Sequence, residues 1–214
     1  MKATNLLIIG FLIFSTSHAS FVMADSYDEL LTAIKQDDIP TAEALFAKGL
    51  DVNTTDRGGN TLLMISIQDD HPDMAKVLLQ RKAAIGARNQ YGETALMLAA
   101  AKGQLELVET LVAHGARINI RGWNPLIYAA WRGRTEVVKF LLDKGANIDA
   151  VAPSGISALM MATRGGYIDA VRLLLAKKAD PNIKSDSGVT ALKWALKGGN
   201  TDIAELLKQA GAKE

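Results

Sequence analysis

Residues 92–119 read GETALMLAAAKGQLELVETLVAHGARIN, and this stretch decides the fold because the chain repeats it several times. Two residues after its leading glycine stands Thr94, and two further on stands Leu96. The leading glycine recurs at intervals of 33, 30, 33 and 33 residues, at Gly59, Gly92, Gly122, Gly155 and Gly188. Self-similarity at a fixed period of this length predicts an array of structural units.

Each repeat predicts two short helices. A threonine or serine that begins the first helix can accept hydrogen bonds from unpaired first-turn N–H groups; these residues are Thr61, Thr94, Ser157 and Thr190. Apolar residues follow at helical spacing until a glycine permits positive φ and ends the helix, at Gly103, Gly133, Gly166 and Gly199. A second apolar helix comes next. Neither helix could bury its apolar stripe alone, so the units must stack.

Two departures from the pattern carry predictions. Lys82 and Lys178 stand where a glycine ends the second helix in other units. A non-glycine residue in the left-handed region costs roughly 1 kcal/mol, so we expect looser junctions there. The 30-residue interval places Gly122 three residues early, and the hairpin between the third and fourth units should therefore be stunted or absent.

The repeated phrase resembles that of the ankyrin repeat, G-x-T-P-L-H-x-A-A. It reads GNTLLMIS, GETALMLAA, GWNPLIYAA, GISALMMAT and GVTALKWAL here, and a degenerate unit over residues 27–53 precedes these five. The resemblance implies an all-α repeat solenoid of about six stacked helix-turn-helix units with hairpin loops, closed by polar end caps. It also implies a non-enzymatic protein-interaction module.

The first 24 residues have the pattern of a secretory signal peptide. Lys2 supplies the positive start, residues 6–14 are apolar, and small residues allow cleavage after Ala19 or Ala24. We favour Ala24, because the earlier cut leaves an apolar tail exposed. The predicted repeat domain is 25–214, with units near 25–57, 58–89, 90–120, 121–150, 151–184 and 185–214. An exported chain without cysteine suits a bacterial periplasm, and secretion beyond the cell is the alternative.

Composition and motifs predict no catalytic, cofactor-binding or metal-ligating residues. Only Lys2 of the 24 basic residues precedes residue 25, so the remaining net charge is 23 minus 23, or zero. Attraction to nucleic acid is therefore not expected, nor is membrane insertion after signal cleavage. His71 and His114 occupy different positions in their units and share no face that could bind a metal. We expect a monomer.

Subtraction of the repeat consensus leaves variable positions, which the resemblance places in a concave groove formed by hairpins and inner helices. The predicted partner-binding residues are Tyr91, Lys102, Arg121, Trp123, Trp131, Arg132, Ile156, Arg164, Val189 and Lys197. Tryptophan and arginine most often anchor protein interfaces, so Trp123 and Trp131 are interpreted as groove residues. The alternative is packing: Trp131 against a neighbouring helix, and Trp123 over the space left by the short hairpin.

Four cations near the ends of successive inner helices predict a basic ladder about 30 Å long: Lys102, Arg132, Arg164 and Lys197. Compensation of helix dipoles explains such charges equally well; the sharper hypothesis is an acidic segment on a protein partner. We therefore expect a periplasmic binding protein, with roles in stress protection or toxin immunity both open. A secreted effector that binds a host protein is the alternative, and an enzyme is disfavoured.

Overall fold

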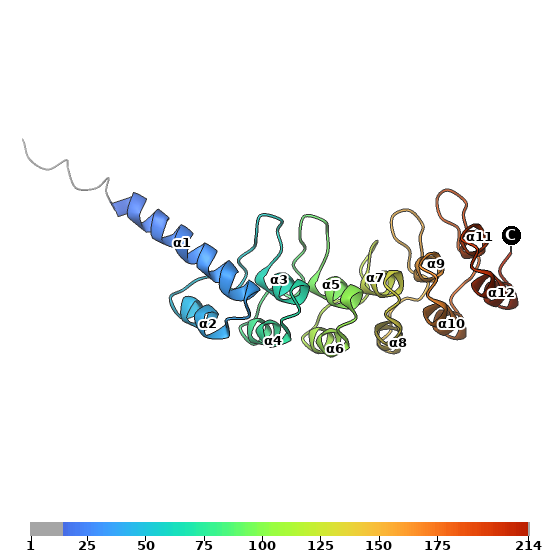
Figure 1. The fold of residues 1–214 in the computed structure, drawn as a ribbon, viewed down its shortest axis with the longest axis horizontal. Coiled ribbons are helices and arrows are strands. Elements are labelled where there is room, and N and C mark those ends of the chain that lie inside the picture. Colours follow the sequence, from blue (N-terminus) through green and yellow to red (C-terminus); the bar gives the residue numbers. More distant parts are fainter. Residues whose placement is uncertain (1–14, 214) are drawn as a thin grey trace, which may run out of the picture.

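The computed structural model describes residues 15–213, which form twelve α-helices paired into six units (Figure 1). Units 1 to 6 comprise, in pairs, α1 (Ser15–Lys35) and α2 (Ile39–Ala47), α3 (Leu62–Gln68) and α4 (Pro72–Gln80), α5 (Ala95–Lys102) and α6 (Leu105–Ala113), α7 (Pro125–Trp131) and α8 (Thr135–Asp143), α9 (Ala158–Arg164) and α10 (Ile168–Ala176), and α11 (Ala191–Lys197) and α12 (Thr201–Gln209).

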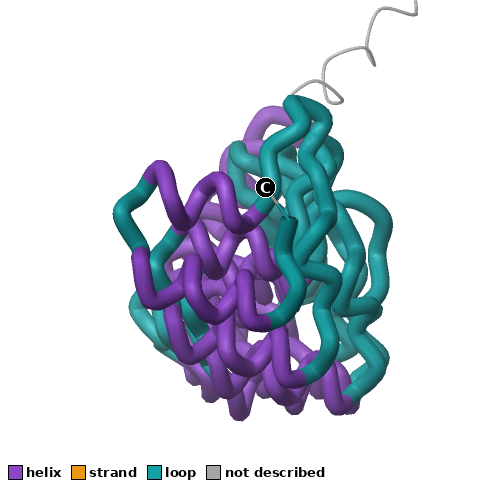
Figure 2. The backbone as a smooth tube through the Cα atoms, turned by 90° about the vertical axis from the view of Figure 1, so that its right-hand side faces the viewer, coloured by secondary structure: helices purple, strands orange, loops and turns teal. Residues whose placement is uncertain are grey.

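The units stack side by side into an elongated array. Helices α3, α5, α7, α9 and α11 form one row and the second helices form a parallel row (Figure 1). The loops that precede the first helices, here called fingers, project together from the helical layer, as the view along the array shows (Figure 2). The predicted all-α repeat solenoid is confirmed.

The predicted helix boundaries follow from side-chain capping and from backbone conformation. Thr61, Thr94, Ser157 and Thr190 each accept a hydrogen bond from the N–H three residues on, at 3.2–3.3 Å. Asn124 does the same for α7 at 3.0 Å. The predicted stop glycines have left-handed φ angles of 64° to 81°, at Gly103, Gly133, Gly166 and Gly199.

Non-glycine residues hold the left-handed conformation at four turns. Lys82 and Lys178 have φ of 62° and 68°, as their place in the repeat predicted. Asp37 and Asp70, with φ of 56° and 63°, take the stop position of α1 and α3, where later units use glycine. Asp tolerates this region better than most residues, and Asp70 also bonds the next unit, as described below.

One apolar core runs through all six units, from Leu30 to Leu207. Its middle contains small residues, and Ala99, Ala100, Ala129 and Ala130 are fully buried in the inner row. Small side chains allow α5 and α7 to approach closely. The predicted polar caps are also present, because Asp28 and Glu29 at one end and Lys208 and Gln209 at the other are exposed.

The finger of unit 4 is stunted, as the 30-residue interval predicted (Figure 1). Each other finger is closed by backbone hydrogen bonds, such as the bond from Asn89 N–H to the Glu93 carbonyl at 3.1 Å. Fingers also bond in pairs, through Gln90 N–H to the Gly58 carbonyl at 3.1 Å and Asp186 N–H to the Ser154 carbonyl at 3.0 Å. The short finger separates these two pairs.

The predicted signal segment lies largely outside the described residues, which begin at Ser15. Helix α1 runs from Ser15 through both candidate cleavage sites to Lys35. Leu30, Ala33 and Ile34, which are buried, lie in the part of α1 that follows Ala24. Within residues 15–213 the helices are all too short or too polar to cross a membrane.

Candidate binding groove

Three open pockets lie in succession along the ends of the inner helices. The central pocket has a volume of about 570 Å³. The N-side pocket, of about 560 Å³, shares Glu93, Tyr128, Trp131 and Arg132 with it. The C-side pocket, of about 490 Å³, shares Arg164. We call the three together the groove. The central pocket is lined by Tyr91, Glu93, Trp123, Tyr128, Trp131, Arg132, Met161, Arg164, Gly165 and Tyr167.

Unit 4 supplies an aromatic cluster to the central pocket. Trp123, from the stunted finger, meets Tyr128 edge-on with ring centroids 5.7 Å apart. Trp131 lies 6.3 Å from Trp123 and 6.1 Å from Tyr128. Trp123 is half-buried against the core, whereas Trp131 is 39% exposed. Trp123 therefore packs against the other two rings and also lines the central pocket, whereas Trp131 presents a more exposed face to the groove.

A hydrogen-bonded chain holds Tyr128 in place. Its hydroxyl donates to Glu93 Oε1 at 2.9 Å, and Asn89 Nδ2 donates to Glu93 Oε2 at 2.9 Å. Burial raises the pKa of Tyr128 well above its usual value, and the hydrogen bond to Glu93 raises it further. Because both carboxylate oxygens of Glu93 have donors from the protein, this side chain fixes the wall of the pocket.

The two arginines of the central pocket each rest on a tryptophan. The Arg132 guanidinium lies 4.5 Å from the Trp131 ring centroid, and that of Arg164 lies 5.5 Å from the ring of Trp194 in α11. Neither guanidinium has a hydrogen bond or ion pair with another side chain in the described part of the chain. Stacking on a ring orients a guanidinium while its N–H edge stays available.

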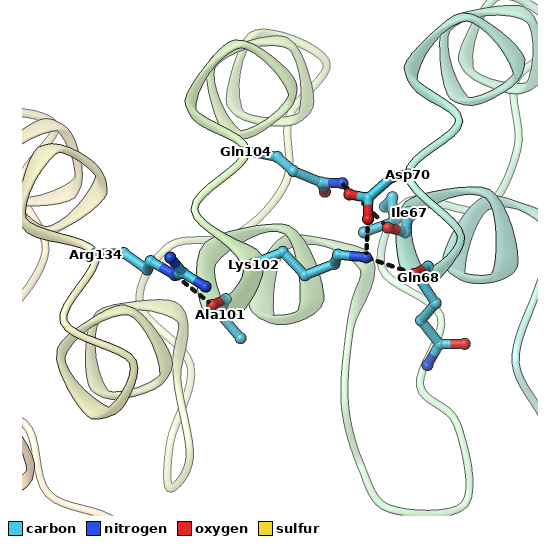
Figure 3. Close-up of polar contacts among 7 residues, drawn as sticks. All are labelled: Ile67, Gln68, Asp70, Ala101, Lys102, Gln104 and Arg134. Atoms are coloured by element: carbon cyan, nitrogen blue, oxygen red, sulfur yellow. Dashed lines mark hydrogen bonds and ion pairs between the residues drawn. The ribbon is translucent and has the colours of Figure 1, made fainter. Parts of the chain in front are cut away.

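Lys102, in contrast, is engaged within the protein (Figure 3). Its ammonium lies 2.6 Å from Asp70 Oδ2 and donates to the Gln68 carbonyl at 2.5 Å. The hydrogen bond from Lys102 lowers the pKa of Asp70. Lys102, one of the four cations of the predicted ladder, therefore bridges units 2 and 3. Charge compensation at a helix end explains this residue.

In units 2, 3 and 4 the residue before the second helix reaches back to the preceding unit. His71 Nε2 lies 3.0 Å from the Lys35 carbonyl. Gln104 donates to the Ile67 carbonyl at 3.1 Å, and Arg134 donates to the Ala101 carbonyl at 3.1 Å (Figure 3). Helix C-terminal carbonyls lack intrahelical partners, and these bonds satisfy them across the unit boundary. In unit 5 the ring of Tyr167 covers Gly133 instead. These contacts agree with a structural role for His71.

Comparison with known proteins decides the family. The model for ankyrin repeats in three copies matches residues 30–122, 82–152 and 146–214. The chain belongs to the ankyrin-repeat family. This ankyrin-repeat protein is similar to the crystal structure of an ankyrin repeat domain from Acinetobacter baumannii AYE, with 31% identity and a TM-score of 0.75 over 86% of this chain and 98% of that one.

Curated relatives match over shorter stretches. An ankyrin repeat protein of Rickettsia bellii is 30% identical over 53% of this chain, and the L-asparaginase of Dirofilaria immitis is 30% identical over 72%. The chain spans only 35% and 27% of their respective lengths. The ankyrin-repeat fold is a protein-protein interaction module and is generally not enzymatic. Among the described residues no group of three His, Asp or Glu is placed to hold a metal.

The structure brings most of the predicted binding residues into the groove. Tyr91, Trp123, Trp131, Arg132 and Arg164 line the central pocket. Lys102 and Lys197 line the N-side and C-side pockets. Three predicted residues line none of the three pockets, namely Arg121, Ile156 and Val189. Arg121 is exposed on the stunted finger, and the other two are half-buried in their fingers.

Sequence reasoning missed one structurally important column of the repeat. This position lies two places after the leucine of the repeated phrase, such as Leu96, and in units 3 to 6 its side chain lines the groove. The residues at this position are Leu98 in the N-side pocket, Tyr128 and Met161 in the central pocket, and Trp194 in the C-side pocket. Its variety of apolar side chains, beside nearly constant alanines, is the signal that could have identified it. Tyr167 was also missed, because it stands outside the inner helices.

Proposed function

We propose that this protein is exported to a bacterial periplasm and binds a protein partner in the groove, with the central pocket as the anchor. The exposed aromatic surface around unit 4, the irregular unit, carries the proposal. Tyr91 is 76% exposed, Trp131 39% and Tyr167 37%, and all three line the same pocket. Such aromatics bury a large area with little loss of entropy and dominate interface energetics.

Charge favours an acidic segment on the partner. Arg132, Arg164 and Lys197 line the central and C-side pockets without an ion pair in the described chain. Glu93 is the acidic residue lining these two pockets, and Tyr128 and Asn89 donate to it. A locally basic groove attracts an acidic partner even when the net charge is zero.

Export is supported by Lys2, by the apolar stretch of residues 6–14 and by the absence of cysteine. Cleavage after Ala24 would leave an eleven-residue first helix, residues 25–35, which keeps the buried residues Leu30, Ala33 and Ile34. Both roles open to exported ankyrin-repeat proteins, stress protection and toxin immunity, require the same groove. We therefore propose the binding function and the compartment, and leave the identity of the partner to experiment.

Site-specific photocrosslinking in living cells tests both parts. A photoreactive phenylalanine derivative at Tyr91 should give a discrete adduct with a protein in the periplasmic fraction, and Trp131→Ala should abolish it. The same derivative at Arg172, exposed on the outer helix α10, is the matched control. No adduct from Tyr91, or equal adducts from both positions, would refute the groove. Recovery of the protein only from the culture medium would favour the secreted-effector alternative.

A further inference from the structure

Two arginines of the central pocket are held differently from three other arginines of the chain. Arg88 and Arg134 donate to backbone carbonyls, at 3.0 and 3.1 Å, and Arg81 pairs with Glu43. Among the described residues, Arg132 and Arg164 have only tryptophan rings as partners. A guanidinium stacked in this way loses little further freedom on binding, and its five N–H donors match a carboxylate in a bidentate pair.

The surroundings of the two guanidiniums are specific for an anion. Glu93, the acidic lining residue of the central pocket, already accepts from Tyr128 and Asn89. Asp70 lines the N-side pocket and is paired with Lys102. No carboxylate lines the C-side pocket, where Arg164 meets Lys197. Two carboxylates from a partner would therefore find donors at Arg132 and Arg164 without displacing an existing ion pair.

The pocket that both arginines line also has apolar walls. Met161 and Tyr167 line the same pocket, and Trp131 forms one wall of it. The pocket is large enough for a bulky side chain. Arg132 follows α7 and Arg164 ends α9. Adjacent packed helices lie about 8–10 Å apart, and three residues of extended or polyproline-type chain span about 9–10 Å.

We propose that the groove recognises an extended acidic segment with two carboxylates three residues apart and a bulky apolar side chain between them. One carboxylate binds Arg132, the other binds Arg164, and the apolar side chain occupies the central pocket against Met161 and Tyr167. This inference rests on the proposed function and specifies the partner of the same groove. A protein segment is favoured over an anionic polysaccharide because apolar side chains line the same pocket as the two cations.

A displayed library of random twelve-residue peptides tests the inference. The target is the protein in the form that the producing cell yields, with any cleavage of its N-terminal segment already made. Selection should enrich peptides with Asp or Glu at positions i and i+3 and an aromatic or large aliphatic residue between them. Replacement of either acid by its amide in a selected peptide should weaken binding about tenfold, since a charge-assisted hydrogen bond contributes that much. Replacement of both should weaken it about a hundredfold.

Variants of the protein identify the donors. Arg132→Gln and Arg164→Gln should each weaken the selected peptide about tenfold and remove its preference for one of the two acids. Arg172→Gln is the matched control, because this arginine is exposed on the outer helix α10. Circular dichroism verifies that each variant is folded. In a charge-reversal test, a peptide in which lysine replaces one of the two acids should regain affinity for Arg164→Glu or for Arg132→Glu. The variant that is rescued shows which arginine binds that acid, and therefore the direction in which the peptide lies in the groove.

The outcomes separate this inference from the function on which it rests. A library that yields no binder would refute the groove itself. Selected peptides without acidic pairs, or peptides bound equally by the Arg132→Gln/Arg164→Gln double variant, would overturn the two-arginine inference and leave the groove intact. Heparin serves as the polysaccharide probe: binding of heparin through the two arginines, without any selected acidic peptide, would overturn the choice of a protein ligand.

Discussion

The hydrogen bonds that join consecutive units have one gap, and filling it should stabilise the protein. Near the end of four units a side-chain oxygen accepts a backbone N–H of the following unit, at 2.7–2.9 Å; the acceptors are Asn53, Asn119, Asp149 and Asn182. The repeat places Gly86 at this position in unit 2. Its counterpart donor, the Arg117 N–H, has no hydrogen bond in the described chain. A cavity of about 80 Å³ lies beside both residues.

Gly86→Asn should increase the free energy of unfolding by about 1–2 kcal/mol. Gly86 is exposed, its φ lies outside the left-handed region, and a Cβ there meets no atom within 4 Å. Replacing such a glycine gains about 0.4–1 kcal/mol by restricting the unfolded chain. The new hydrogen bond to Arg117 N–H adds a net 0.5–1.5 kcal/mol or so.

Urea unfolding followed by circular dichroism measures the change. Gly86→Ala provides the backbone term alone, so the difference between the two variants isolates the hydrogen bond. In the opposite direction, Asn119→Ala removes bonds to Asn147 N–H and the Gly145 carbonyl, at 2.9 and 2.8 Å, and should destabilise by about 1–2 kcal/mol. If Gly86→Asn is no more stable than Gly86→Ala at equal denaturant slope, the inferred bond between units 2 and 3 does not form.

Three further predictions concern turns and titration. Gly199→Ala should lower the free energy of unfolding by about 1 kcal/mol, because Gly199 has a left-handed φ of 70°. Gly133→Ala should lower it by about 1–3 kcal/mol more, because the added Cβ would overlap the Tyr167 ring. Equal losses of stability in urea unfolding would contradict this packing. Lys82→Gly should raise the free energy of unfolding by up to about 1 kcal/mol, because Lys82 has a left-handed φ of 62° that glycine adopts more easily. An unchanged or lower urea midpoint would contradict this prediction. The raised pKa of Tyr128 means that the folded state keeps this phenol protonated above pH 10 or so, where the unfolded chain ionises it. That contribution to stability is complete below about pH 10 and is lost as the pH rises from there toward the folded pKa. Tyr128→Phe should therefore reduce the fall of stability with pH between about pH 10 and 12, and an unchanged slope would show that Tyr128 ionises normally.

The repeat architecture could be predicted because its determinants are local. A threonine cap such as Thr94 and a stop glycine such as Gly103 act within one turn of their own helix, and both have the predicted geometry. The stunted finger could also be predicted, because the three residues missing before Gly122 leave too little chain to close a hairpin. Period and spacing thus determine the units and the place where their regularity fails.

The site could be predicted only in part, because its chemistry depends on contacts between units. Lys102 looked like a free cation, yet it pairs with Asp70, 32 residues earlier, whose unusual place at a helix stop was the only hint. Arg132 and Arg164 belong to consecutive units, 4 and 5. Arg164 stacks on Trp194, which belongs to unit 6. Cations at equivalent positions of the repeat thus have different partners, and for Lys102 and Arg164 the partner comes from a neighbouring unit. In unit 4 Trp123 of the stunted finger packs against Tyr128 and Trp131, and Trp131 is 39% exposed. The irregular unit is therefore where the repeat leaves an aromatic surface open to a partner.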